Sequence, residues 1–408
     1  MSWFYRCGIL GPVNCDVAII GAGLTGLSLG LALSQAGRRV VVLDARSAPA
    51  LEPLGEGVFD TRIYAIGPAS ARWLDGLRLW GALDAARITP VYDMQIHGDA
   101  AASPAHGLAL SAYRSGVGEL CTIVEEREVA RVLGAAAGFA VGLEVLRPVR
   151  IASMVPTPEA MRITLTDGRV VHAGLAIGAD GGRSWARGAA GIETDVFDYH
   201  QTAVVANFNC EKPHYNLASQ WFRTEADGSS GVLAWLPLPG RRISMVWSAG
   251  TALAGELIAM PATALAERVA AAGMNSLGFL AQTGTRAAYP LINQRARRLS
   301  GARFALVGDA AHVLHPLAGQ GLNLGFGDCA GLCAALAGAR DCGDHTALRA
   351  YERARKAALA EMHALTHGMA RLFALDNPAA RALRNIGLNL VGRLPVLSQM
   401  IVRGAIRG

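Results

Sequence analysis

Short continuous runs of apolar residues alternate with glycine-rich turns at the start of this chain. Residues 15–20 (CDVAII) and 39–43 (RVVVL) have the length and composition of strands that are buried on both faces of a parallel sheet. Between them, the apolar stretch 24–36 predicts a helix, which Gly37 ends. A further run at 304–307 predicts another strand, followed by a helix that extends to about residue 337. This order of elements predicts an α/β fold with a Rossmann-like domain.

Two other patterns occupy the middle and the end of the chain. Residues 195–283 contain alternating, strand-like stretches that glycine and proline turn signals punctuate. We expect them to form a strand-rich insert beside the first domain. From residue 346 to 373 apolar residues recur at helical spacing, and Glu352 is placed to pair with Lys356.

Composition narrows the class of protein. Apolar residues make up 52% of the 408 residues and charged residues only 17%, which suits an apolar surface or a membrane contact. The formal net charge of +6 would also suit nucleic acid, but no binding motif or dense basic tract supports that class. Seven cysteines without a Cys-x-x-Cys argue against a disulfide framework and against a metal site. We interpret Cys329 and Cys333, which share a helix face, as packing residues.

The glycines near the N-terminus form a dinucleotide fingerprint. The uncharged run 17–37 is long enough to suggest a membrane-spanning helix, but Gly21, Gly23 and Gly26 fall where a buried strand turns into a helix. They permit the turn, the approach of a pyrophosphate and close packing of helix on strand. Asp44, at the end of the second strand, can accept hydrogen bonds from a ribose. The residues expected to contact the dinucleotide are Gly21, Ala22, Gly23, Leu24, Gly26, Asp44, Ala45 and Arg46.

This fingerprint does not choose between NAD and FAD, and two further motifs bear on that choice. The second motif is 178–184 (GADGGRS), and the third consists of 308–312 (GDAAH) and 316–323 (PLAGQGLN). A carboxylate at the strand end, Asp309, can bond a ribitol hydroxyl, and backbone N–H groups at the helix start can stabilise a reduced flavin ring. The candidate residues are Asp180, Gly181, Gly308, Asp309, Pro316, Gly319, Gln320, Gly321, Leu322 and Asn323.

The three motifs, in this order and spacing, resemble the single-component FAD-dependent aromatic hydroxylases of the para-hydroxybenzoate hydroxylase-like fold. A narrower similarity, to the hydroxylases of ubiquinone biosynthesis, covers nearly the whole chain. It rests on 59–66 (FDTRIYAI) with Arg62, on 123–127 (IVEER) with Arg127, on 236–238 and 244–248, and on the C-terminal stretch 371–395. The resemblance implies that Arg62 and Arg127 help to hold FAD. Asp44 departs from the glutamate usual in that family, and Trp185 departs from its smaller residues.

The resemblance implies an FAD-dependent monooxygenase that NADH or NADPH reduces transiently and that uses dioxygen to hydroxylate an aromatic, lipid-tailed phenol or quinol. The residues alone identify no catalytic acid or base. We interpret His312 and His315 as structural, with imidazoles bonded to nearby backbone, and we interpret Trp221, Trp235 and Trp247 as core.

These patterns divide the chain into three parts. The expected parts are a discontinuous FAD-binding domain at 15–85, 110–190 and 285–340, a substrate-binding domain at 86–109 and 191–284, and a C-terminal helical region at 341–408.

After Asp376 the chain carries arginines and no acid. The arginines alternate with apolar residues, a pattern that suits an anionic membrane surface, although a helical cap on the flavin domain has the same pattern. We therefore expect a cytoplasmic protein, peripheral on the inner membrane, that works beside other proteins of ubiquinone biosynthesis. Two alternatives stay open from the sequence: a polyprenyl reductase on the same fold, and a flavin-bearing scaffold without turnover. A halogenase would carry W-x-W-x-I-P, which is absent.

Overall fold

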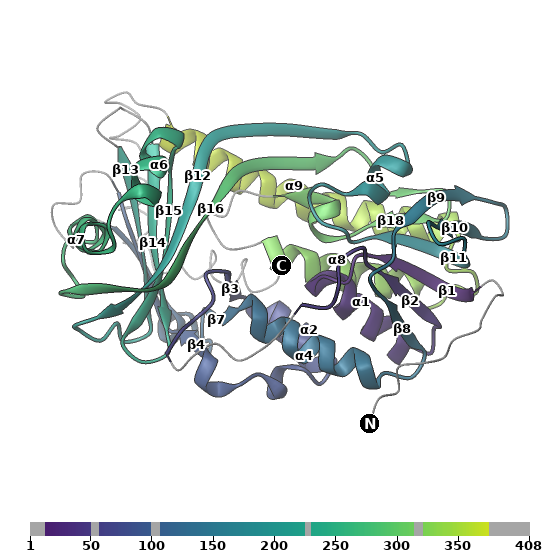
Figure 1. The fold of residues 1–408 in the computed structure, drawn as a ribbon, viewed down its shortest axis with the longest axis horizontal. Coiled ribbons are helices and arrows are strands. Elements are labelled where there is room, and N and C mark those ends of the chain that lie inside the picture. The colour runs from purple at the N-terminus through teal and green to yellow at the C-terminus, as the bar shows by residue number, and fades with distance from the viewer. Residues whose placement is uncertain (1–12, 50–56, 99–106, 225–229, 314–320, 375–408) are drawn as a thin grey trace.

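The computed structural model describes residues 13–49, 57–98, 107–224, 230–313 and 321–374. Its elements form three sheets with helices packed between and around them (Figure 1). Two of the sheets lie toward opposite ends of the molecule, and the long strands β12 (Thr194–Cys210) and β16 (Leu280–Ala296) run from one end toward the other. The α/β class predicted from the sequence is confirmed.

The first sheet contains the strands predicted near the N-terminus. β18 (Phe304–Leu306), β11 (Val170–Gly178), β1 (Val13–Ile20), β2 (Val40–Leu43) and β8 (Leu143–Leu146) are parallel neighbours in that order. β17 (Ser300–Gly301) pairs with β18 at one edge, and β9 (Ile151–Pro156) and β10 (Met161–Leu165) join through β11. Val40–Leu43 is buried at every position, as a strand covered on both faces must be.

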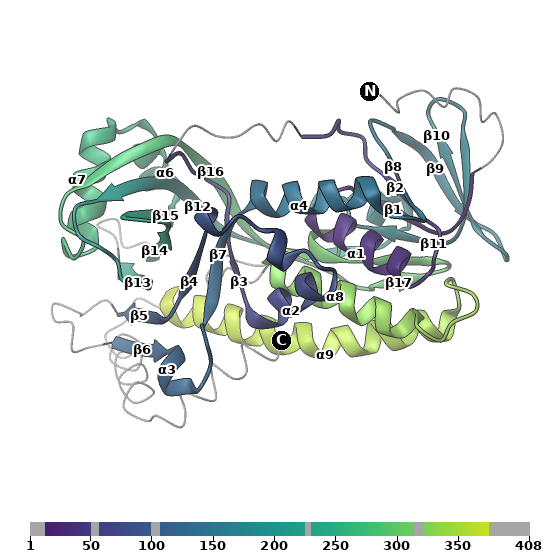
Figure 2. The same ribbon diagram turned by 90° about the horizontal axis from the view of Figure 1, so that it is seen from below.

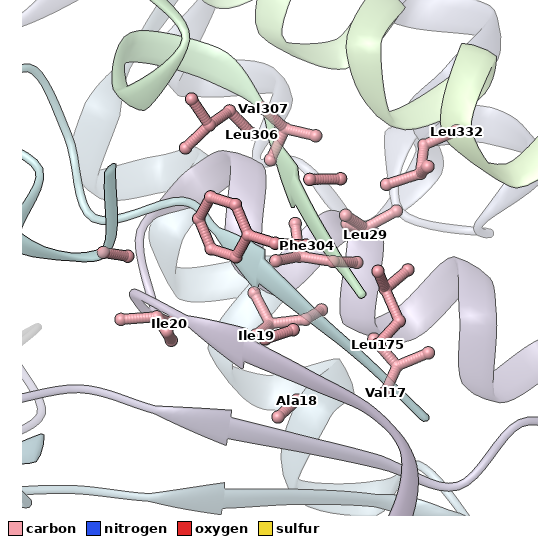
Figure 3. Packing of buried hydrophobic residues seen from close by; sticks show 14 of the residues in the cluster. Val17, Ala18, Ile19, Ile20, Leu29, Leu175, Phe304, Leu306, Val307 and Leu332 are labelled. Atoms are coloured by element: carbon pink, nitrogen blue, oxygen red, sulfur yellow. The ribbon is translucent and has the colours of Figure 1, made fainter. Parts of the chain in front are cut away.

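Helices cover this sheet through continuous apolar faces. α1 (Leu24–Gln35) and α8 (Gly321–Leu336) place Leu29 and Leu332 against strand residues such as Ile19 and Leu175, and none of these four side chains is measurably exposed (Figure 3). Phe304 fills the adjoining space on β18. Burying each of these large side chains contributes about 1.5–3 kcal/mol, so the core holds the motif-bearing strands firmly in register.

The second sheet is built by the strand-rich part of the chain. Its order is β19 (His312–Val313), β16, β12, β15 (Arg242–Gly250), β14 (Ser230–Leu238), β13 (Leu217–Thr224), β5 (Asp93–His97) and β6 (Gly107–Ser111). All neighbours are antiparallel except β13 and β5. α6 (Thr251–Ala259) and α7 (Ala262–Ala272) cover one face of it. The expected boundary between 284 and 285 falls inside β16, which pairs with β12 on both sides of that point.

The three tryptophans interpreted as core lie on the face of this sheet that α6 and α7 cover. Trp221, Trp235 and Trp247 are at most 5% exposed and share one apolar cluster with Leu257 and Leu265. Trp221 and Trp235 meet edge to face, with ring centroids 4.8 Å apart. The core interpretation is therefore confirmed, since these rings stabilise the sheet from behind.

A third, small sheet joins the other two. It consists of β3 (Ile63–Ile66), β7 (Cys121–Glu125) and β4 (Ile88–Val91), and β4 and β7 contact β14 of the second sheet. α2 (Pro68–Gly76) follows β3 and contacts α8. α4 (Glu126–Phe139) follows β7 and packs on α1. The short elements of the chain are η1 (Trp80–Ala82), η2 (Ala85–Arg87), α3 (Ala112–Ser115), α5 (Trp185–Ala189) and η3 (Gly308–Ala310).

The helix predicted from residue 346 to 373 is α9 (His345–Ala374), which lies along α8 (Figure 2). The expected Glu352–Lys356 pair forms at 2.7 Å, and Glu352 also accepts the hydroxyl of Ser300 at 2.5 Å. Among the described helices none is long and apolar enough to cross a membrane. The run 17–37 instead divides into β1 and α1 around the glycine turn, as the fingerprint predicts.

Candidate functional site

Four neighbouring parallel strands end at the same level of the first sheet. Leu43 pairs with Ile20, Ile20 with Gly178, and Gly178 with Leu306, and each of these residues is the last of its strand. The residues that follow are the fingerprint turn, Asp44, the second motif and the third motif. The register therefore brings all three motifs to one edge of the sheet, where α/β proteins bind ligands.

The fingerprint glycines have two structural tasks and leave one open position. Gly21 has φ +112°, and a Cβ there would lie 2.3 Å from the Ala179 carbonyl oxygen. A Cβ on Gly26 would lie 2.0 Å from the Gly21 carbonyl oxygen, so only glycine lets α1 approach the turn. A Cβ on Gly23 would meet no atom of the described residues within 4 Å. The space above Gly23 is thus free for a ligand.

This open position is also the start of α1. Gly23 is the N-cap, no side chain caps the first N–H groups, and the first turn holds no acid. The first residues of the helix, Leu24 and Thr25, therefore present backbone donors and the positive end of the helix dipole to the free space. A pyrophosphate fits such a position.

Asp44 lies beside the turn and is nearly buried. One carboxylate oxygen accepts the N–H of Ala22 at 2.7 Å and the other accepts the N–H of Arg46 at 2.7 Å. Burial alone would raise the pKa of Asp44, but these two N–H groups and the Arg46 guanidinium lower it below the usual value. Ala45 and Arg46 are exposed beside it. An ionised acid with unused lone pairs is suited to bond ribose hydroxyls.

Hydrogen bonds connect the segment of the second motif to the third motif. Asp180 accepts the hydroxyl of Ser184 and, at 3.0 Å, the N–H of Ala186, so its carboxylate caps α5. Arg187 donates to the Ala310 carbonyl at 2.8 Å and to the Gly182 carbonyl at 3.0 Å. Gly181 has φ +85°, which glycine adopts without strain. Any contact of Asp180 with a cofactor therefore shares a carboxylate that α5 already uses.

In the third motif, Asp309 is accessible to solvent although protein atoms surround much of its carboxyl group. Its side chain is exposed, yet surrounding protein raises the pKa of its carboxyl, an effect that His312 and Arg62 reduce. A group on the wall of a concave surface has this combination, because water reaches it and protein surrounds it. Pro316, Gly319 and Gln320 lie outside the described residues.

At the start of α8, backbone groups are more available to a cofactor than side chains are. Gly321 is its first residue, and the Leu322 side chain is buried. Asn323 accepts the N–H of Gly67 at 3.0 Å and donates to the Ala65 carbonyl at 2.9 Å. Its side chain thus holds the segment after β3 against α8, and backbone N–H groups are what this turn of helix offers to a cofactor.

Arg62 brings the small sheet to the same region. It pairs with Glu126 at 2.8 Å and lies over the Tyr289 ring, 5.7 Å from its centroid. Tyr64 is close to Arg62 and Asp309, and burial raises the pKa of its hydroxyl well above the usual range. Arg127 is half-buried in the first turn of α4. The structure therefore gathers Arg62, Tyr64, Tyr289 and Asp309 from three separate segments.

Sequence reasoning missed several polar residues that hold this arrangement. Glu125, 1% exposed, accepts two bonds from Arg87, at 2.6 and 2.8 Å, and also the N–H of Asp60 at 2.5 Å. Asp328, on α8, is fully buried and bonds His312 at 2.7 Å. His312 is structural, as expected, but its observed partner is this carboxylate and not backbone. A single acid in an otherwise uncharged helix was the available signal for Asp328.

No cluster of metal ligands occurs in the part of the chain that the structure describes. Six cysteines of that part are free, and Cys329 and Cys333 pack in the core as interpreted. The open Gly23 position and the acid-free first turn of α1 fit the pyrophosphate of a dinucleotide such as FAD.

Comparisons with known proteins identify the family of the chain. A family model for the FAD binding domain matches residues 14–366. Ubiquinone hydroxylase UbiL of Rhodospirillum rubrum is 34% identical over 97% of this chain and 91% of its own length. The 3-demethoxyubiquinol 3-hydroxylase of Escherichia coli is 31% identical over 96% of this chain and 98% of its own. Among solved structures, p-nitrophenol 4-monooxygenase of Pseudomonas putida shares the fold, with a TM-score of 0.75, 17% identity and coverage of 97% of this chain and 99% of its own.

The family match spans well over half of the chain, and two hydroxylases above 30% identity align with nearly all of it. The chain therefore belongs to the FAD-binding family, as an FAD-dependent monooxygenase related to the ubiquinone hydroxylases.

Proposed function

We propose that this enzyme hydroxylates the ring of a polyprenyl phenol or quinol in ubiquinone biosynthesis, with FAD, dioxygen and NADH or NADPH. The observation that carries the proposal is the common level of four strand ends, which places the three motifs at one edge. Alignment with ubiquinone hydroxylases over nearly the whole chain supports the substrate class.

Bound FAD supplies the redox chemistry by which dioxygen is activated and one oxygen atom reaches the ring. The protein binds and orients the cofactor. We propose that the start of α1 at Gly23 holds the pyrophosphate, that Asp44 bonds the ribose and that Asp309 bonds the ribitol. We propose that the other residues expected from the sequence, including Arg62, Arg127, Asp180 and Asn323, also line the cofactor site.

Tyr64 and Tyr289 are the side chains we propose for the substrate side of the site. A tyrosine hydroxyl is protonated at neutral pH, and burial raises the pKa of Tyr64 further, so this hydroxyl can donate to an oxygen on a bound ring. Tyr289, opposite Ala203 on the β12–β16 pair, presents an aromatic face to Arg62.

The decisive experiment follows oxygen into the product. Purified enzyme with FAD, NADPH or NADH and a short-chain polyprenyl quinol precursor is supplied with ¹⁸O₂, and the product is analysed by mass spectrometry. We expect one labelled oxygen on the ring, and none when the label is in water instead. A product that is reduced in its polyprenyl chain and carries no label would establish the reductase alternative and reject hydroxylation.

We also propose peripheral contact with an anionic membrane surface, because a lipid-tailed substrate partitions into the bilayer. The basic, acid-free stretch after Asp376, which lies outside the described residues, supports this proposal. Replacing its arginines by glutamine should reduce flotation with phosphatidylglycerol vesicles and leave FAD content unchanged; the positions are Arg381, Arg384, Arg393, Arg403 and Arg407. Unchanged flotation would contradict the membrane contact and favour the alternative, in which the stretch is a helical cap on the flavin domain.

A further inference from the structure

An ionic network is buried beside the third motif and joins this motif to α8 and α9. Asp328 of α8 is 0% exposed, His312 is 1% exposed and Arg355 of α9 is 9% exposed. One Asp328 oxygen accepts the N–H of Gly308 at 2.9 Å and bonds His312 Nε2 at 2.7 Å, and the other accepts Arg355 Nε–H at 2.7 Å. We call these three side chains the Asp328 network.

The sequence makes room for this network with glycines. A Cβ on Gly327 would lie 3.1 Å from an Arg355 terminal nitrogen, and one on Gly331 would lie 3.0 Å from Arg355 Cδ. α8 therefore presents a bare surface across which Arg355 reaches Asp328. Arg355 also donates to the Leu324 carbonyl at 3.3 Å, one turn before the acid.

A buried carboxylate is costly unless partners compensate its charge. Burial raises the pKa of Asp328, but His312, Arg355 and the Gly308 N–H together lower it below the ordinary value, so the group is ionised. The Asp328 carboxylate is therefore a fixed negative charge, and its partners Gly308, His312 and Arg355 come from three different elements. A purely apolar contact would pack α8 on α9 without this cost, so the polar arrangement calls for a specific role.

The contact with Gly308 indicates that role. Gly308 directly precedes Asp309 and has φ +60°, and a Cβ there would lie 3.0 Å from Thr25 Oγ1. The Gly308 N–H donates to Asp328, while the carboxyl of the next residue, Asp309, is exposed. Thr25 belongs to the first turn of α1, so the first and third motifs meet at this point.

We propose that Asp328 is a positioning residue for the flavin site: held between His312 and Arg355, it fixes the Gly308 backbone and so sets the place of the Asp309 carboxyl. This rests on the proposal that Asp309 bonds the cofactor. The three side chains of the network are buried, so they act on FAD through the third motif. The test of this proposal is therefore independent of which ring is hydroxylated.

The test compares Asp328→Asn with Tyr351→Phe in the full-length protein. Tyr351 is also buried on α9, one turn from Arg355, and donates to the Leu306 carbonyl at 2.7 Å, so its loss removes a buried bond nearby and leaves Asp328 intact. Apoprotein of each is titrated with FAD well below its melting temperature, and the visible flavin spectrum is recorded. We expect Asp328→Asn to raise the Kd for FAD at least tenfold and to shift the spectrum. Tyr351→Phe should lower the melting temperature but keep the wild-type Kd and spectrum.

Two outcomes would overturn the proposal. One is wild-type FAD affinity and a wild-type spectrum in Asp328→Asn. The other is a loss of FAD affinity in Tyr351→Phe as large as that in Asp328→Asn. Either result would mean that the network stabilises the fold in general and does not position the flavin site. If Asp328→Asn does not fold, His312→Gln and His312→Leu carry the test. Glutamine keeps a donor toward Asp328 and should keep FAD affinity, whereas leucine should weaken it; equal affinity in the two variants would reject the positioning role.

Discussion

The Asp44 carboxylate, at the end of β2, accepts the backbone N–H of Ala22, inside the fingerprint turn, at 2.7 Å. The acid that the sequence marks for a ribose is therefore also part of the turn that approaches the pyrophosphate. Aspartate in place of the family's usual glutamate is consistent with this double task, because the shorter side chain stays close to the turn.

Replacing Asp44 by alanine should weaken FAD binding and destabilise the apoprotein. The Ala22 and Arg46 N–H groups would lose a charged acceptor, which is worth about 1.5–3 kcal/mol. Asp44→Asn should fall between alanine and wild type, because it keeps one acceptor. FAD fluorescence titration and chemical unfolding of the apoprotein measure the two effects. Loss of stability with unchanged FAD affinity would show that Asp44 serves only the turn.

Substitution at Gly23 should separate cofactor binding from folding. A Cβ there would have no atom of the described residues within 4 Å, so we expect Gly23→Val to change the stability of the apoprotein by less than about 1 kcal/mol. The valine side chain occupies the space proposed for the pyrophosphate, and the purified variant should be colourless. Gly134→Val, on α4, is the matched control because a Cβ at Gly134 is equally unobstructed. A yellow Gly23→Val protein would exclude this position from the site.

The local elements and the order of the motifs could be predicted from the sequence. Buried strands, a glycine turn and amphipathic spacing are local signals, and β1, α1, β2, α8 and α9 lie within a few residues of the expected bounds. The Glu352–Lys356 pair is likewise a neighbour on one helix. These features depend on residues that are close along the chain.

Contacts between distant segments could not be predicted in this way. Asp328 and Arg355 lie on different helices, and nothing in their spacing indicates that glycines of α8 bring them together. The partnership of Glu125 with Arg87 and Asp60 depends on how β7 pairs beside β4 and β3. Such partners follow from strand order and helix packing, which periodicity does not determine.

Trp247→Ala should damage stability and not substrate choice. The ring is 1% exposed in the apolar cluster beneath α6 and α7, and removing a buried tryptophan costs about 3–5 kcal/mol. KM for the quinol should stay near that of wild type in whatever fraction remains folded. Trp247→Phe, which retains a ring, should recover most of the stability. A large rise in KM without loss of stability would place this tryptophan in the substrate site.

Asp309→Asn should stabilise the apoprotein at neutral pH while weakening FAD binding. Because the folded-state pKa of Asp309 is raised, the folded protein holds this proton more tightly than the unfolded chain does. Its ionisation therefore lowers stability as pH rises from the ordinary value of about 3.9 through the folded pKa, and asparagine removes that cost. The gain should be small, about 1 kcal/mol or less, because water reaches the carboxyl.

A pH series of apoprotein melting temperatures measures this effect, and Asp341 provides a control of opposite sign. Its hydrogen bonds with Arg303 lower its pKa, so its contribution is present above the ordinary aspartate value and disappears as pH falls through the lower folded pKa. Asp341→Asn should therefore slightly destabilise the protein at neutral pH and leave FAD affinity unchanged. The two melting curves should approach the wild-type curve only in acid. If Asp309→Asn is instead less stable than wild type at neutral pH, its carboxylate contributes to the fold itself and the ribitol assignment loses its support.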